Sequence, residues 1–190
     1  MEITERLYAK NRNQWREWLA ENHSVKREIW VSTSECDGGL SYLDAVEEAL
    51  CFGWIDSTIK SGVGVMWRRF SPRRPRSPWT ELNKERCRRL ERLGLMTDAG
   101  RAVLPNMDFR IEDDVLAALQ SDDVVWQNFQ TLHPLYVRVR IDNIQNMRKR
   151  NFEVFQRRLQ KFMDNTRDGV IYGDWHDDGR LLSADDDLGK

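Results

Sequence analysis

The sequence predicts an α+β fold, in which a small, mainly antiparallel sheet is packed by helices and followed by an all-helical C-terminal portion. Three observations lead to this fold class. Residues 54–70 combine alternating side chains with two glycines, which is typical of a β-hairpin. Capping residues and apolar residues at helical spacing occur on both sides of that hairpin. After residue 114 only helical patterns follow.

Two helices and two strands are expected before the hairpin. Residues 5–10 are predicted to form a short opening strand, and residues 27–34, rich in aromatic and β-branched side chains, a second strand. Asn11 and Ser41 each stand where an N-cap is expected, so a helix should begin after each of them. Gly53 follows the second helix, as expected of its C-terminal end.

The hairpin itself is predicted to pair residues 54–60 with residues 65–70 in antiparallel fashion, because the glycines between them permit a chain reversal. The period of two in the first strand predicts that Asp56 and Lys60 share one face. Residues 71–78 contain three prolines, which remove ladder donors, and are therefore predicted to be a loop.

Three parts are expected along the chain. Residues 1–104 are predicted to form an α+β core with the tryptophan-rich hairpin and a basic loop, since six of the eight tryptophans fall in the first 80 residues. Residues 105–182 are expected to be a helical portion packed on that core. Residues 183–190 are expected to be a flexible acidic tail.

The charge balance disfavours a nucleic-acid-coating protein. The chain carries 30 Lys and Arg against 31 Asp and Glu, a net charge of −1, and shows no recognised nucleic-acid-binding motif. The N-terminus lacks the basic start and apolar run of a signal peptide, and no apolar stretch is long enough to span a membrane. We therefore expect a cytoplasmic protein.

Neither a metal nor a cofactor is expected. Cys36, Cys51 and Cys87 are scattered without metal-ligand spacing, and the three histidines are equally dispersed. All three cysteines are predicted to be free thiols. Cys51 lies near Glu48, but no sequence signature supports a reactive thiolate there.

The candidate site is an anion site built from the hairpin and its basic loop. Guanidinium groups present planar forks suited to phosphate or carboxylate, and a helix starting near residue 77 would add unpaired N–H groups. The residues proposed to bind the anion are Asp56, Lys60, Arg69, Arg73, Arg74 and Trp79. No catalytic residue is assigned.

A purely structural interpretation stands beside this one. Asp56 can pair with Arg69 across the hairpin, and the loop arginines can bind the Glu47 and Glu48 carboxylates or only water. In that case the basic loop binds no ligand.

Several segments resemble a known family. The run Glu47–Ser57, the strand Glu28–Val31 and the segment Arg69–Arg73 are similar to the YdeI/OmpD-associated (bacteriocin-protection) family. The resemblance covers residues 13–104, whereas the C-terminal half resembles the family more loosely. It implies protection against bacteriocins and cationic antimicrobial peptides, and it transfers no catalytic residue.

Two functions are compatible with these observations. The first is a non-enzymatic stress-protection or adaptor protein that binds an anionic ligand or a protein partner. The alternative is an enzyme that acts on a phosphorylated or carboxylated small molecule through Asp56, Lys60 and the arginines. A pocket with two titratable groups in hydrogen-bond reach would favour the enzyme.

Overall fold

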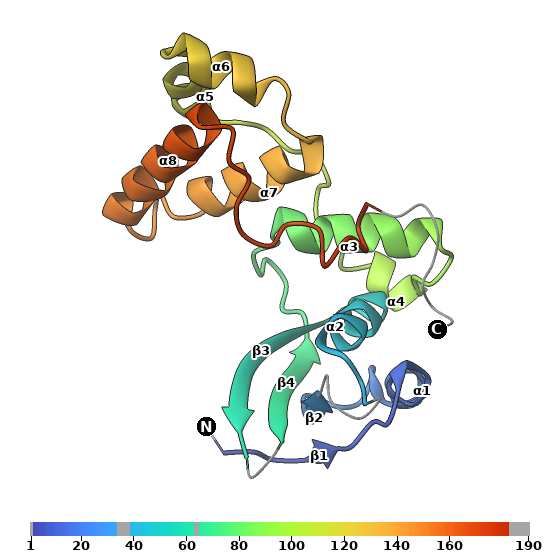
Figure 1. Cartoon of the computed structure of the whole chain (residues 1–190). Coiled ribbons are helices and arrows are strands. Elements are labelled where there is room, and N and C mark those ends of the chain that lie inside the picture. The colour runs from blue at the N-terminus through green and yellow to red at the C-terminus, as the bar shows by residue number, and fades with distance from the viewer. Residues whose placement is uncertain (1, 34–38, 63–64, 183–190) are drawn as a thin grey trace. The chain divides into compact units, whose positions relative to one another are not determined.

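The computed structural model of the chain describes residues 2–33, 39–62 and 65–182 (Figure 1). It divides into two units: residues 1–78 with 86–106 form the first, and residues 79–85 with 107–190 form the second. Helix α3 (Glu81–Arg92) contributes residues to both units. Cys36, part of the hairpin turn and the expected tail at residues 183–190 lie outside the described residues.

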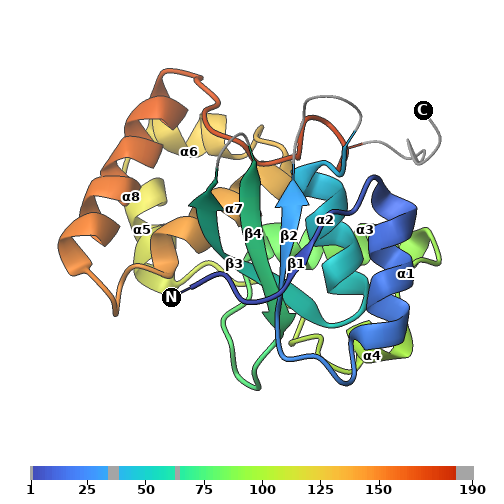
Figure 2. The ribbon, with the colours of Figure 1, turned by 90° about the horizontal axis from the view of Figure 1, so that it is seen from below.

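The first unit is built on a four-stranded sheet with the order β1-β2-β4-β3 (Figure 2). Its strands are β1 (Arg6–Leu7), β2 (Ile29–Thr33), β3 (Trp54–Ser61) and β4 (Met66–Pro72). The β2–β4 and β3–β4 pairs are antiparallel, and β1 is parallel to β2. The predicted α+β class and hairpin are therefore confirmed, with a mixed rather than purely antiparallel sheet.

Helices α1 (Arg12–Asn22) and α2 (Tyr42–Cys51) pack on one face of this sheet. Trp15 of α1 is fully buried, lies 5.3 Å from the Phe70 ring of β4, and donates its indole N–H to the Ala45 carbonyl at 2.9 Å. A buried indole is satisfied in this way while its ring fills the core. The indole of Trp15 thus ties α1 to both α2 and the sheet.

The predicted helix caps form. The Asn11 side chain accepts a hydrogen bond from the Gln14 N–H at 3.0 Å, and Ser41 accepts one from the Asp44 N–H at 3.1 Å. Gly53 ends α2 with φ +74, and a Cβ at this position would meet the Ala99 carbonyl oxygen at 2.9 Å. Glycine is required there for two independent reasons, the left-handed backbone and the close approach.

A β-bulge interrupts the hairpin between Asp56 and Ile59. Asp56 pairs with Phe70 and Ile59 pairs with Arg68, so three steps on β3 oppose two on β4. A bulge of this kind shifts the alternation of side chains by one residue. Lys60, which pairs with Trp67, therefore lies on the opposite face from Asp56.

The first unit is completed by the later turns of α3 and by the short helix α4 (Asp98–Arg101). Thr97 caps α4 by accepting from the Gly100 N–H at 3.3 Å, and its hydroxyl donates to the Cys51 carbonyl at 2.6 Å. This hydrogen bond attaches α4 to the end of α2.

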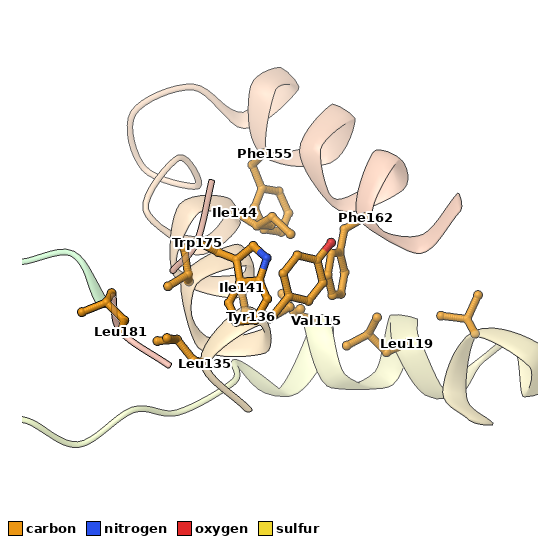
Figure 3. Packing of buried hydrophobic residues seen from close by; sticks show 12 residues of the cluster. Val115, Leu119, Leu135, Tyr136, Ile141, Ile144, Phe155, Phe162, Trp175 and Leu181 are labelled. Carbon is orange, nitrogen blue, oxygen red and sulfur yellow. The ribbon is translucent and has the colours of Figure 1, made fainter. Parts of the chain in front are cut away.

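The second unit is helical, with α5 (Asp113–Gln120), α6 (Asp123–Phe129), α7 (Pro134–Gln145) and α8 (Phe152–Arg167). Its core brings Val115 and Leu119 of α5 together with aromatic residues of α7 and α8 (Figure 3). Phe162 of α8 is fully buried and lies 6.1 Å from the Tyr136 ring. Phe155 and Phe162 of α8 thus pack within the core of the second unit, whereas Phe152 at the N-terminal end of the helix is 55% exposed.

Candidate functional site

The residues predicted to bind an anion are only partly brought together: Asp56 interacts electrostatically with Arg73, whereas Lys60 lies on the other face of the sheet. Asp56 and Lys60 were expected to share a face of β3, but the β-bulge places them on opposite faces. Lys60 instead holds its ammonium 5.6 Å from the centre of the Trp30 ring. The expectation of a shared face was wrong because a single inserted residue, invisible in the alternating pattern, reverses the register.

Asp56 is engaged by Arg68 rather than by Arg69. The Arg68 guanidinium lies 3.2 Å from the Asp56 carboxylate and stacks 3.9 Å above the Tyr42 ring of α2. Burial is the main reason why the pKa of Tyr42 is raised, and the nearby Asp56 carboxylate adds to the effect. This cluster lies on the face of the sheet that the helices cover.

Arg69 binds a different carboxylate on the other face. Its Nε and one terminal nitrogen donate to Glu28 at 2.8 and 2.5 Å, and its other terminal nitrogen donates to Ser57 at 3.2 Å. Hydrogen bonds from Thr4 and Arg69 lower the pKa of Glu28. The Arg69 guanidinium is thus already bound by the Glu28 carboxylate within the first unit.

The two loop arginines differ from each other. Arg73 is buried and donates to the Ser77 hydroxyl at 3.0 Å and the Pro78 carbonyl at 3.2 Å, and burial lowers its pKa. Arg74 is exposed. Trp79 belongs to the second unit, whereas the hairpin residues belong to the first.

The helix N-terminus expected near residue 77 begins later and is already capped. Helix α3 starts at Glu81, whose N–H donates to the Asp142 carboxylate at 3.0 Å within the second unit. Burial, together with the neighbouring Glu81 carboxylate, raises the pKa of Asp142, although the hydrogen bond from the Glu81 N–H opposes this. A carboxylate at this position supplies the acceptor that an anionic ligand would otherwise supply.

Glu47 and Glu48 bind arginines that sequence reasoning did not assign to them. Glu47 accepts from Arg12 at 3.0 Å and Arg89 at 2.9 Å, and Glu48 accepts from Arg12 at 2.5 Å and Arg16 at 2.6 Å. Both glutamates are buried. This network joins α1 and α2 to the part of α3 in the first unit, which is a structural role.

The thiol beside this network is not poised for reaction. Burial, reinforced by the Glu48 carboxylate, raises the pKa of Cys51 to about 12. A thiol with so high a pKa forms almost no thiolate at neutral pH. Cys51 and Cys87 are both free and buried.

A pocket with the character of an anion site lies in the second unit instead. It measures about 320 Å³ and is lined by Arg140, Asn143 and Ile144 of α7, Arg158 and Lys161 of α8, and Tyr172. The segment after α8 returns along α7 and brings Tyr172 to it (Figure 1). The lining holds three cations and no carboxylate.

Arg140 is held in place by neutral partners. One terminal nitrogen donates to the Asp174 carbonyl, and its guanidinium lies 5.2 Å from the Tyr172 ring and 5.6 Å from the Tyr136 ring. Its Nε is buried and makes no hydrogen bond to any described residue. A buried N–H without an acceptor costs about 1–3 kcal/mol.

The two cations of α8 are one turn apart and reach the same pocket. Arg158 donates to the Asn143 carbonyl of α7 at 2.7 Å, and the Lys161 ammonium lies 4.8 Å from the Tyr172 ring. Within the described part of the chain, none of Arg140, Arg158 and Lys161 forms an ion pair with a carboxylate.

Tyr172 supplies a neutral hydroxyl. Burial, with the adjacent Tyr136, raises its pKa, although Arg140 and Arg158 oppose this shift. The hydroxyl consequently stays protonated at neutral pH and can donate a hydrogen bond. The pocket thus offers charged donors, one hydroxyl and the Asn143 amide.

Sequence reasoning missed this pocket. The one signal was the i, i+3 spacing of Arg158 and Lys161, which places them on the same side of a helix. The third cation, Arg140, is 18 residues earlier, and only the packing of α7 against α8 brings it close.

Two family models match the chain, and the boundary between them lies close to the boundary between the two structural units. Residues 7–103, just over half of the chain, match the family model described as "Domain of unknown function (DUF8412)". Residues 108–169 match the model "Bacteriocin-protection, YdeI or OmpD-Associated". The chain belongs to the first of these families and carries a YdeI/OmpD-associated domain. The suspected YdeI/OmpD-associated family is thereby confirmed.

The confirmed match lies in a different segment from the resemblance. The sequence resembled the family most over residues 13–104, whereas the YdeI/OmpD-associated match covers residues 108–169. Arg140, Arg158 and Lys161 all fall inside that match. No curated protein and no solved structure matches the chain.

The described residues contain neither a membrane-spanning helix nor a cluster of metal-binding side chains. None of the helices among them is both long and apolar enough to cross a bilayer. No group of three or more His, Cys, Asp or Glu side chains in the same part of the chain could hold a metal ion.

Proposed function

We propose that this protein is a non-enzymatic, anion-binding member of the YdeI/OmpD-associated group, and that its ligand binds in the pocket formed by Arg140, Arg158, Lys161 and Tyr172. The observation that carries the proposal is the convergence of three cations with no carboxylate among them. Positive side chains gathered without an internal counter-charge repel one another, and an anion removes that repulsion.

The size of the pocket favours a small ligand over a macromolecule. A volume of about 320 Å³ lies at the lower end of the usual range for small-molecule sites, roughly 300–1,000 Å³. A charged ligand of this size fits a protective or adaptor role in which ligand binding adjusts the affinity for a protein partner. We place that role in the cytoplasm, a location supported by the free thiols of Cys51 and Cys87.

Isothermal titration calorimetry with inorganic phosphate, sulfate and acetate tests the proposal. The double variant Arg158→Gln/Lys161→Gln should bind any of these anions at least about tenfold more weakly, because each lost charge-assisted hydrogen bond contributes about 1.5–3 kcal/mol. Arg157→Gln is the matched control, since Arg157 is an exposed arginine on the same helix outside the pocket lining.

Both variants should unfold at the wild-type temperature, because exposed charges contribute little to stability. Absence of binding to the wild type, or equal binding by the wild type and the double variant, would refute an anion site at this pocket. The enzymatic alternative is separated by incubating the protein with phenyl phosphate: release of inorganic phosphate would contradict a pure binding role.

A further inference from the structure

We infer that the pocket of Arg140, Arg158, Lys161 and Tyr172 recognises a doubly charged phosphoryl group in preference to a singly charged anion. This inference rests on the proposed anion-binding function and specifies its ligand class. Three features of the lining support it: the number of charges, the excess of donors, and the distribution of those donors over separate segments.

The charge count favours a dianion. The pocket contains three cationic side chains and no carboxylate. Arg140 contacts the backbone carbonyl of Asp174. The side-chain carboxylate of Asp174 instead accepts a hydrogen bond from the Asp177 N–H at 3.3 Å. A monoanion such as a carboxylate or a sulfate ester would neutralise one of the three charges, whereas a phosphate monoester neutralises two at neutral pH.

The hydrogen-bonding character of the lining favours a ligand with acceptors only. Arginine and lysine side chains donate and never accept, and a protonated tyrosine hydroxyl donates readily. Arg140 also has a buried Nε–H that no described residue accepts. An ionised phosphoryl group presents three acceptor oxygens, whereas a carboxylate presents two.

The donors approach from three segments. Arg140 comes from α7, Arg158 and Lys161 from α8, and Tyr172 from the segment after α8. Donors on three sides suit a tetrahedral group, whose oxygens point in different directions, better than a planar carboxylate, which a single guanidinium fork can satisfy. Ile144 supplies an apolar wall for the remainder of an organic ligand.

Three ligands that differ in one property each provide the test. Phenyl phosphate, phenyl sulfate and benzoate carry the same ring, but only phenyl phosphate is a dianion at neutral pH, and only benzoate is planar at its charged group. Calorimetry at constant ionic strength and about pH 7.5 should show phenyl phosphate binding about tenfold or more tightly than the other two, as one further charge-assisted contact predicts.

The pH dependence gives a second readout. The polar groups that line the pocket are those of Arg140, Asn143, Arg158, Lys161 and Tyr172, and Arg140 also contacts the Tyr136 ring and the Asp174 carbonyl. None of these side chains is a histidine, which ordinarily titrates near neutrality, or a carboxylate, which ordinarily titrates at about pH 4 and can be shifted upward by burial. Because a phosphate monoester loses its second proton at a pKa of about 6, its advantage over phenyl sulfate should disappear by about pH 5.

The outcomes are distinguishable. Equal affinities for phenyl phosphate and phenyl sulfate at about pH 7.5, or an advantage that persists unchanged at about pH 5, would overturn the dianion preference while leaving the anion site intact. No binding of any of the three would overturn both. Inorganic phosphate binding as tightly as phenyl phosphate would identify free phosphate as the source of the phosphoryl group, and weaker binding would identify an organic phosphate.

Discussion

Two clusters of cationic side chains, one in each unit, differ in the groups that they contact. In the first unit, Arg12, Arg16 and Arg89 are bound by the buried carboxylates of Glu47 and Glu48. In the second unit, the cations of the α7–α8 pocket contact carbonyls and aromatic rings, and none of them pairs with a carboxylate of the described residues. The densest run of arginines in the sequence, residues 68–76, includes Arg68 and Arg69, which carboxylates also bind. The density of arginines along the chain therefore does not indicate which cations lack a carboxylate partner.

The largest expected effect is a loss of stability when a buried carboxylate that binds arginines is removed. Glu47→Ala should destabilise the protein by about 3–5 kcal/mol, because it leaves Arg12 and Arg89 without a carboxylate that they bind in a buried network. Urea denaturation measures the loss. Glu17→Ala, which removes an exposed glutamate from α1, is the control and should change stability by less than about 0.5 kcal/mol. A small effect at Glu47 would mean that the network is not what holds these helices together.

An intermediate effect on stability is expected in the basic loop, where Arg73 and Arg74 should respond differently to substitution. Arg73→Ala should cost about 1–3 kcal/mol, because it removes the buried hydrogen bonds to Ser77 and Pro78. Arg74→Ala should have almost no effect, since Arg74 is exposed. Thermal melting of the two variants makes the comparison. If Arg74→Ala instead weakens anion binding, the loop rather than the α7–α8 pocket is the site.

A smaller effect is expected in the pH dependence of stability at Asp142, whose carboxylate has no nearby cation strong enough to offset its burial. The raised pKa of Asp142 means that the folded state holds this proton more tightly than the unfolded state, so the stability contribution is full at low pH. This contribution to stability is lost as the pH rises from the ordinary pKa of 3.8 through the raised pKa of the folded state. Asp142→Asn should remove this dependence and keep the cap on α3, because the amide oxygen also accepts from the Glu81 N–H. Denaturation curves between about pH 4 and pH 7 test this; a variant as pH-sensitive as the wild type would contradict it.

Local patterns in the sequence were sufficient for the elements of the fold. Asn11 and Ser41 cap the helices that their positions predicted, and the hairpin forms where alternation and glycine indicated it. These features depend on residues a few positions apart, so the sequence displays them directly.

The site could not be predicted in the same way. The β-bulge after Asp56 cannot be recognised in the alternating sequence pattern, yet it places Lys60 on the other face of the sheet. Asp56 then forms an ion pair with Arg68. Likewise, Tyr172 reaches Arg140 only because the segment after α8 returns along α7. Both outcomes depend on tertiary packing between residues far apart in the sequence.

The most direct test of the central claim is to observe the arginine Nε–H resonances by NMR while phenyl phosphate is added. Single Arg→Lys variants at residues 69, 74, 140 and 158 assign the signals. The account predicts that Arg140 and Arg158 shift with the same saturation curve, because their N–H groups receive the ligand, while Arg69 and Arg74 stay unchanged. Shifts confined to Arg69 and Arg74, with Arg140 and Arg158 unaffected, would contradict it and return the site to the hairpin of the first unit.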